Sequence, residues 1–264
     1  MKKKNKKKIS FNYKDINKGF YDKVFKKKTI VFNYEDIPIG FYDKVFKKKK
    51  GIQSKWHHIH YDLVKRILGN YKKHLDVGAA AGTFINCLDK EKFSYGADIS
   101  VNQINYAKNK YQTNKHKFFL IKNNILPFKS NTFDIVTNLQ LIEHLSIKDN
   151  KKLIKEIYRV LKPNGKLIIT TPNYQSAWIL VEKVVNLLGE VKYQKQHITF
   201  FNKKKIELLL EQLKFKNINI TTNIFLAPFF AYFGWKVSDC IQKIEDKYFN
   251  HPFRFLLFVI CEKK

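Results

Sequence analysis

The sequence predicts an α/β domain in which helices cover both faces of a mostly parallel sheet. Short apolar strands alternate with helical segments between residues 74 and 171, and this alternation is typical of a parallel sheet. The 264-residue length is sufficient for one such domain with added segments. Hydrophobic residues make up 44% of the chain, which is enough to form a sizeable core. We therefore expect one domain over residues 51–264.

The expected elements follow one another in a regular order. Residues 51–71 have an apolar helical face and end in Gly69 and Asn70, so they predict a helix. Apolar runs predict strands at residues 74–77, 93–99, 117–122, 133–138, 167–171, 216–222 and 253–261. Helical spacing and capping residues predict helices at 83–88, from Ser100 to about Gln112, at 149–161 and after Asn202, with a turn at 163–165.

Residues 1–50 form a basic extension that contains a tandem duplication. The segment FNYKDINKGFYDKVFKKK at 11–28 recurs as FNYEDIPIGFYDKVFKKK at 32–49, and 15 of the 18 positions are identical. Two copies are too few for a repeat array, which needs at least three units to bury a core. We expect the second copy to dock on the domain, because it connects directly to residue 51, and the first copy to be loosely held.

The net charge of +29 is carried almost entirely by lysine. Arg66, Arg159 and Arg254 are the only arginines, and arginine is the side chain best suited to bidentate contacts with phosphates and bases. We interpret the lysine excess as a compositional bias with a solvated surface, so nucleic acid is not the expected partner. A surface for a polyanion or an anionic membrane is the alternative.

The cysteines and the N-terminus suggest a compartment. Cys87, Cys240 and Cys261 are not at CxxC spacing, which predicts reduced thiols and no metal site. No apolar run follows the initial MKKKNKKKIS, so we expect no signal peptide and a cytoplasmic protein. The apolar run at 224–235 is too short to span a bilayer. It could line a substrate pocket, contact a membrane peripherally, or pack as a helix against the core.

The first strand–helix connection is the first candidate ligand site, because parallel sheets bind ligands at the carboxyl ends of their strands. Its sequence LDVGAAAGTF (75–84) has small side chains that let a ligand approach the backbone, and a helix N-terminus follows. Asp98, twenty residues beyond Gly78, ends the second strand and can accept hydrogen bonds from both ribose hydroxyls of an adenosine. The glycines lack the GxGxxG spacing, which disfavours a nicotinamide-dependent dehydrogenase.

Four segments in order resemble the class I S-adenosylmethionine-dependent methyltransferases. They are LDVGAAAGTF, GADIS (96–100), NILPFKSNTFDIVTNLQLIEHL (124–145) and EIYRVLKPNGKLIITTPN (156–173). The resemblance covers residues 51–264 and includes ubiquinone-pathway O-methyltransferases and methyltransferases of glycan clusters. It implies the Rossmann-like class I methyltransferase fold, with a seven-stranded, mostly parallel sheet whose last strand is antiparallel. It also implies S-adenosyl-L-methionine as the cofactor.

The resemblance further implies cofactor contacts after four successive strands. The loop after the first strand would line the methionine moiety, and the acid after the second would bind the ribose. The residues after the third would contact the adenine, and those after the fourth would flank the sulfonium. In that order the implied residues are Asp76, Gly78, Ala80 and Gly82; Asp98 and Ile99; Asn124 and Ile125; and Leu139 and Gln140.

Two of these positions depart from the family pattern. Ala80 stands where the middle glycine is usual, and we expect it to be tolerated, because alanine has no polar atom and avoids only positive φ. Asn124, or Asn123 in another alignment, stands where an acid is usual. An amide can still accept a hydrogen bond from the adenine amino group, so we expect cofactor binding to be weakened but retained.

Residues on the acceptor side are suggested by position alone. His144 and His197 are candidate general bases, with ordering of their loops as the alternative role. Tyr42, Trp56 and His57 are candidate substrate contacts, although the aromatic side chains of the N-terminal segment could instead pack it down. The segments 174–200 and 224–250 would form a cap. The HHxH cluster at 57–60 has no carboxylate or cysteine at ligand spacing, so no metal site is expected.

Together these patterns predict an S-adenosylmethionine-dependent methyltransferase that O-methylates a small molecule or a glycan or lipid intermediate. Methyl transfer depends mainly on positioning, so it does not require a strong catalytic residue. Two alternatives stay open. The net charge favours a nucleic-acid-binding protein on a methyltransferase scaffold, and the substitutions at Ala80 and Asn124 favour a non-catalytic one.

Overall fold

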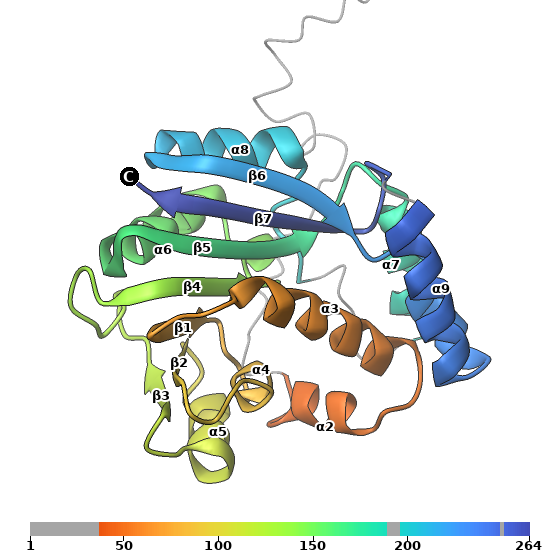
Figure 1. The fold of residues 1–264 in the computed structure, drawn as a ribbon, viewed down its shortest axis with the longest axis horizontal. Helices are drawn as coiled ribbons and strands as arrows, with labels where there is room; N and C mark the ends of the chain where they lie inside the picture. The colour runs from red at the N-terminus through yellow and green to blue at the C-terminus, as the bar shows by residue number, and fades with distance from the viewer. Residues whose placement is uncertain (1–36, 189–195, 249–250) are drawn as a thin grey trace, which may run out of the picture. The chain divides into compact units, whose positions relative to one another are not determined.

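The computed structural model describes residues 37–188, 196–248 and 251–264. The chain divides into two units, residues 1–33 and 34–264, and every described element belongs to the second. The strands of that unit form one seven-stranded sheet (Figure 1). They are β1 (Lys73–Val77), β2 (Phe93–Asp98), β3 (His116–Leu120), β4 (Phe133–Leu139), β5 (Leu161–Pro172), β6 (Phe215–Asn223) and β7 (Leu256–Lys263).

The order of the strands is β3-β2-β1-β4-β5-β7-β6. The pairs β1–β2, β2–β3, β1–β4 and β4–β5 are parallel, whereas β7 is antiparallel to both β5 and β6. The strand order reverses between β1 and β4, which is where an open α/β sheet forms a ligand crevice. The predicted fold class is therefore confirmed, with its antiparallel last strand.

Helices form at the five predicted places with small changes at their ends, and further helical segments form outside these places. In chain order the helices are α2 (Phe41–Lys47), α3 (Ile52–Leu68), α4 (Thr83–Asn86), α5 (Val101–Tyr111), η3 (Ile142–His144), α6 (Ile147–Val160), α7 (Trp178–Leu188), α8 (Lys203–Gln212), η5 (Ala227–Tyr232) and α9 (Trp235–Tyr248). The predicted caps form, because Ser100 accepts a hydrogen bond from the Gln103 N–H and Asn202 accepts one from the Lys205 N–H. The predicted turn at 163–165 lies within β5, where residues 162–165 have no partner in the register with β4 and Asn164 has φ 59°.

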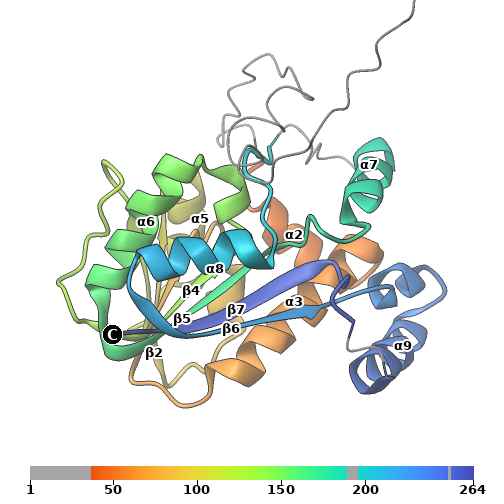
Figure 2. The ribbon, with the colours of Figure 1, turned by 90° about the horizontal axis from the view of Figure 1, so that it is seen from above.

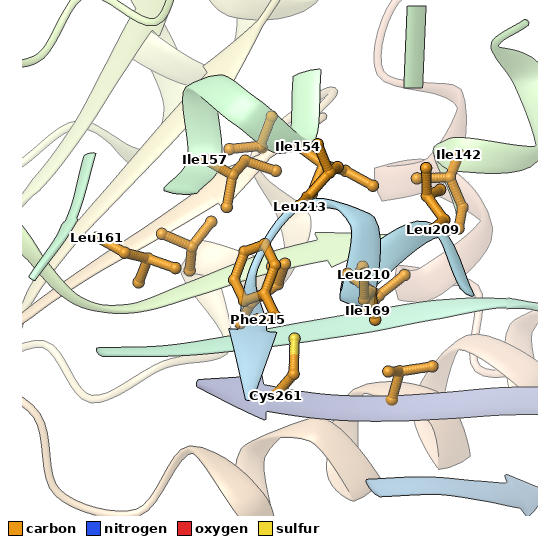
Figure 3. Packing of buried hydrophobic residues seen from close by; sticks show 14 of the residues in the cluster. Ile142, Ile154, Ile157, Leu161, Ile169, Leu209, Leu210, Leu213, Phe215 and Cys261 are labelled. Carbon is orange, nitrogen blue, oxygen red and sulfur yellow. The ribbon is translucent and has the colours of Figure 1, made fainter. Parts of the chain in front are cut away.

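Successive residues of the central strands alternate between two hydrophobic cores, one on each face of the sheet. On β4, Ile135 packs with α3, α4 and α5, whereas Val136 packs with α6 and α8. The same alternation separates Ile168 from Ile169 on β5. Figure 2 shows the helices on the two sides of the sheet, and Figure 3 shows the core beneath α6 and α8. Helices on both faces explain why apolar residues of these strands are buried on each side of the sheet.

A smaller apolar cluster joins α3, α7, η5 and α9 near the carboxyl end of β5 (Figure 1). Trp56 of α3 packs against Trp178 of α7, with ring centroids 5.0 Å apart. The apolar run at 224–235 forms part of this cluster through Ala227, but Tyr232 and Phe233 remain 82% and 72% exposed. Within the described part of the chain, no helix is both long and apolar enough to cross a membrane.

Residues 37–48 of the second N-terminal copy pack against α5 through a buried carboxylate. Asp43 of α2 has no exposed surface and accepts hydrogen bonds from the hydroxyls of Tyr106, at 2.8 Å, and Tyr111. Lys110 donates to the same carboxylate at 2.9 Å, and Lys47 forms an ion pair with it at 3.2 Å. The first copy, at 11–28, lies outside the described residues.

Candidate functional site

The ten predicted cofactor residues lie at the carboxyl ends of β1, β2 and β4 or in the segments that follow β1, β2, β3 and β4, which are adjacent parallel strands. Carboxyl ends of parallel strands lie at the same edge of a sheet, so this topology gathers the four segments at one edge. Hydrogen bonds between the segments fix their arrangement. The N–H groups of Gly78 and Ala79 donate to the carbonyl oxygen of Ala97 at 2.8 and 3.1 Å.

The loop after β1 turns through three residues with positive φ: Gly78 (85°), Ala80 (43°) and Gly82 (75°). The expectation that Ala80 would avoid positive φ is therefore wrong. A side chain at Gly82 would lie 2.6 Å from the ring of Phe118, so this glycine is required for packing of the loop on the core. A side chain at Gly78 would similarly meet Leu141, at 2.8 Å.

Asp98 ends β2 with its carboxylate held by two backbone N–H groups. Ala80 donates to Oδ2 at 2.8 Å and Ser100 donates to Oδ1 at 2.9 Å. The residue that follows it, Ile99, is 55% exposed, and Ile125 after β3 is 58% exposed. The site thus combines an oriented acid with two apolar side chains that are more than half exposed. This combination suits a ligand with one polar part and one flat apolar part.

Asp76 has a structural partner within the sheet. Thr137 of β4 donates to its Oδ1 at 2.7 Å, and the ring of His74 is hydrogen-bonded to the same hydroxyl at 2.8 Å. Burial raises the pKa of Asp76 to about 7, and the nearby charge of Asp98 adds to the effect. These contacts link β1 to β4 directly beneath the candidate site.

The segments after β3 and β4 also turn sharply. Asn123 and Asn124 both have positive φ, at 53° and 58°, which asparagine tolerates better than most residues. Leu139 is the last residue of β4, and Gln140 follows with φ 51° and its N–H bonded to the Thr170 carbonyl. Among the described residues, the buried side-chain Nε2 of Gln140 has no hydrogen-bond partner. An orphaned buried donor at this edge is a feature that a bound ligand would satisfy.

The two candidate bases, His144 and His197, meet across 52 residues of sequence, with ring centroids 4.9 Å apart. Burial and the neighbouring His197 lower the pKa of His144 to about 3, so its imidazole is neutral. Nδ1 of His197 lies 2.8 Å from Oε1 of Glu182 and 2.5 Å from the hydroxyl of Tyr174. Glu143, which also belongs to this cluster, has its pKa raised to about 7 by burial.

The sequence did not single out Glu182 or Tyr174. Glu182 lies in α7, and a single acidic residue in an apolar helix is usually expected to be exposed to solvent. In the structure its side chain is buried. Tyr174 follows β5 with no motif around it. Only the folded chain brings these two side chains to His197, so no local signal could have identified them.

The three substrate candidates lie in two separate groups of contacts. Tyr42 and His57 contact each other, with ring centroids 5.8 Å apart, and burial lowers the pKa of His57 to about 4. Trp56 instead belongs to the apolar cluster with Trp178. The side chain of His58 stacks on Phe46, on a different side of α3 from His57.

The histidines at 57–60 have separate partners. His58 is bonded to the Phe46 carbonyl at 3.0 Å and His60 to the Thr170 hydroxyl at 2.9 Å. Among the described residues, the one group of at least three side chains with potential ligand atoms close together is Glu143, His144 and His197, whose atoms lie within 4.8 Å of one another.

Comparisons with known proteins match this edge of the sheet. The family described as "Methyltransferase domain" matches residues 75–169, which include the loop after β1 and most of β5. A phosphoethanolamine N-methyltransferase of Plasmodium falciparum is 35% identical over 111 residues, covering 39% of this chain and 40% of the relative. A ubiquinone biosynthesis O-methyltransferase of Coxiella burnetii is 34% identical over 122 residues, covering 43% of this chain and 51% of the relative.

The chain thus spans about half or less of the length of these two relatives. A solved structure of a SAM-dependent methyltransferase from Thermotoga maritima has the same fold, with a TM-score of 0.62 and 17% identity, and covers 84% of this chain and 94% of its own. The strand order, the loop after β1 and these similarities agree with one another. Residues 75–169 thus match the methyltransferase domain family, and the chain has the class I S-adenosylmethionine-dependent methyltransferase fold.

Proposed function

We propose that the protein is an enzyme that transfers a methyl group from S-adenosylmethionine to a hydroxyl of a small molecule or of a glycan- or lipid-linked intermediate. The observation that carries the proposal is the Asp98 carboxylate, held by the N–H groups of Ala80 and Ser100 beside the exposed side chains of Ile99 and Ile125. An oriented acid suits the ribose hydroxyls, and the two isoleucines suit the faces of an adenine.

The residues present fit this cofactor. Asp98 would hold the ribose, Ile99 and Ile125 would pack on the adenine, and the orphaned Nε2 of Gln140 offers a donor near the methionine end. When bound, S-adenosylmethionine supplies an electrophilic methyl group, whose bond to sulfur breaks as the bond to the acceptor forms, leaving a neutral thioether. The role of the chain would be to hold the two partners in line.

A cluster of polar side chains, all buried except the half-buried His144, supports a small polar acceptor. Glu143 and His144 come from the segment after β4, Glu182 from α7 and His197 from the segment before α8. Sites that recognise hydroxyl groups use a few such polar groups in a shielded position. His144 is a poor general base at neutral pH, because its pKa is lowered to about 3 by burial and by His197.

The test uses S-adenosylmethionine that carries carbon-13 in its methyl group. The full-length protein is incubated with separate small-molecule, glycolipid and nucleic-acid extracts, and the label is located by mass spectrometry and by the chemical shift of the methyl carbon. An O-methyl signal in a small-molecule or glycolipid fraction is expected. An N-methyl signal, label confined to nucleic acid, or no transfer to any fraction would contradict the proposal.

A further inference from the structure

Glu143, His144 and His197 form a group of three side chains with the chemistry of metal ligands. Their potential ligand atoms lie within 4.8 Å of one another; Glu143 and His144 belong to η3, which follows β4, and His197 lies in the segment before α8. Nitrogen and oxygen ligands that share one transition-metal ion at about 2.1 Å are separated by roughly 3–4 Å. A small rotation of the side chains would therefore bring these atoms around one ion.

Polar neighbours orient the rings of the two histidines. Nδ1 of His144 lies 3.1 Å from the carbonyl oxygen of Gln196, and a carbonyl can only accept, so Nδ1 carries the proton and the lone pair is on Nε2. Nδ1 of His197 lies 2.8 Å from Oε1 of Glu182 and 2.5 Å from the hydroxyl of Tyr174. A carboxylate or carbonyl behind Nδ1 is the usual support of a metal-binding histidine.

Glu143 provides a second and independent observation. Its side chain is 1% exposed, and Oε2 accepts a hydrogen bond from Thr171 at 3.0 Å. Oε1 is also buried and has no hydrogen-bond partner among the described residues. A buried carboxylate oxygen without a partner is unfavourable, and a cation at this position would compensate it.

We propose that Glu143, His144 and His197 bind one divalent transition-metal ion, with Glu182 and Tyr174 as the residues that position His197. Two imidazoles and one carboxylate favour ions such as Zn²⁺, Mn²⁺ or Fe²⁺ over Mg²⁺ and Ca²⁺, and they leave coordination positions for an acceptor. Such an ion would lower the pKa of an acceptor hydroxyl. The two histidines then act as ligands rather than as the general bases predicted from the sequence, and the expectation of no metal site is revised.

The role of the ion rests on the proposed function, but the site can be tested without it. Full-length protein treated with a chelator and dialysed is titrated with Co²⁺, whose visible d–d absorption reports nitrogen and oxygen coordination. Metal content after gel filtration gives the stoichiometry. We expect one Co²⁺ per chain, with Glu143→Gln and His197→Gln each weakening its affinity at least 100-fold. Glu182→Gln, which keeps all three ligands, should weaken it about 10- to 100-fold.

Matched controls come from exposed residues of the same types. Glu207→Gln on α8 and His251→Gln should leave Co²⁺ affinity unchanged, because both side chains lie on the surface outside the cluster. Circular dichroism and binding of S-adenosylhomocysteine show whether each variant is folded. If a cluster variant does not fold, the wild-type stoichiometry and the Glu182→Gln affinity still decide the question.

The outcomes separate this inference from the proposed function. A protein that binds S-adenosylhomocysteine but retains no Co²⁺ overturns the metal site and leaves the proposed function standing. A protein that retains one Co²⁺ but binds no S-adenosylhomocysteine overturns the proposed function and leaves the metal site standing. Retention of Co²⁺ with equal affinity in Glu143→Gln, His197→Gln and Glu182→Gln would also overturn the site, because the ion would then be bound elsewhere.

Discussion

The backbone N–H of Ala80 donates a hydrogen bond of 2.8 Å to Oδ2 of Asp98. This bond joins the loop after β1 to the end of β2 and fixes the acid that we assign to the ribose. Because the donor is a backbone group, the bond does not require glycine at position 80. It does require the loop to turn there, and Ala80 makes that turn with φ 43°.

Replacing Ala80 with glycine should stabilise the protein. Alanine in the left-handed region destabilises the folded state by about 1–2 kcal/mol. Glycine removes this strain, but it loses more conformational entropy on folding, which costs about 0.5–1 kcal/mol. We expect Ala80→Gly to raise the free energy of unfolding by about 0.5 kcal/mol in urea denaturation. A lower stability would show that position 80 is not strained. Unchanged affinity for S-adenosylhomocysteine would also argue against a scaffold that lost catalysis through this substitution.

Replacing Gly82 with alanine should destabilise the fold through both strain and overlap. Gly82 has φ 75° and ψ 13°, in the left-handed region where alanine costs about 1–2 kcal/mol. A methyl group there would also meet the ring of Phe118 at 2.6 Å. We expect Gly82→Ala to lower the free energy of unfolding by about 2–4 kcal/mol in thermal or urea unfolding. A loss of only about 1 kcal/mol, that of the backbone strain alone, would mean that α4 can move away from Phe118.

Asp43 should make stability depend on pH in the acid range. Burial alone would raise its pKa, but hydrogen bonds from Tyr111, Lys110 and Tyr106 and the Lys47 contact outweigh burial, so the pKa is lowered. A carboxyl group whose pKa is lower in the folded state stabilises the fold above its unfolded pKa, near 4. This stabilisation is lost as the pH falls through the folded value.

The corresponding variant is Asp43→Asn, which should lower the free energy of unfolding at pH 7 by about 1–3 kcal/mol. Asp62→Asn is the control, because its ion pair with Lys65 is exposed and should contribute less than about 0.5 kcal/mol. Urea unfolding at pH 7 and pH 3 measures both. The difference between wild type and Asp43→Asn should shrink at pH 3, and a constant difference would exclude the linkage.

The fold was predictable because its signals are local. Isoleucine, leucine and phenylalanine runs mark the strands, and Ser100 and Asn202 mark helix starts through bonds within one turn. The turn predicted at 163–165 interrupts β5 instead of preceding it. Residues 162–165 have no partner in the register with β4, and Asn164 has φ 59°, but Leu161 already pairs with Phe133, so the strand begins before the turn.

The site was predictable only in part. The loop after β1 and Asp98 are close in sequence to strand ends, so the topology alone gathers them. The contacts of Asp43 with α5 and of Glu182 with His197 depend on which side chains meet between distant helices and loops. The spacing of hydrophobic residues and the positions of turn residues carry no information on such contacts. The contacts of Asp43 and Glu182 could therefore not be predicted from the sequence.

Calorimetric titration of S-adenosylhomocysteine into the full-length protein tests the central claim most directly. We expect one site per chain in the wild type and an affinity at least 100-fold weaker in Asp98→Ala, because about 1.5–3 kcal/mol is lost for each hydrogen bond from a ribose hydroxyl to the carboxylate. Asp62→Ala, an exposed acid of α3, should bind as the wild type does. No binding by the folded wild type, or equal affinity in Asp98→Ala, would contradict the account.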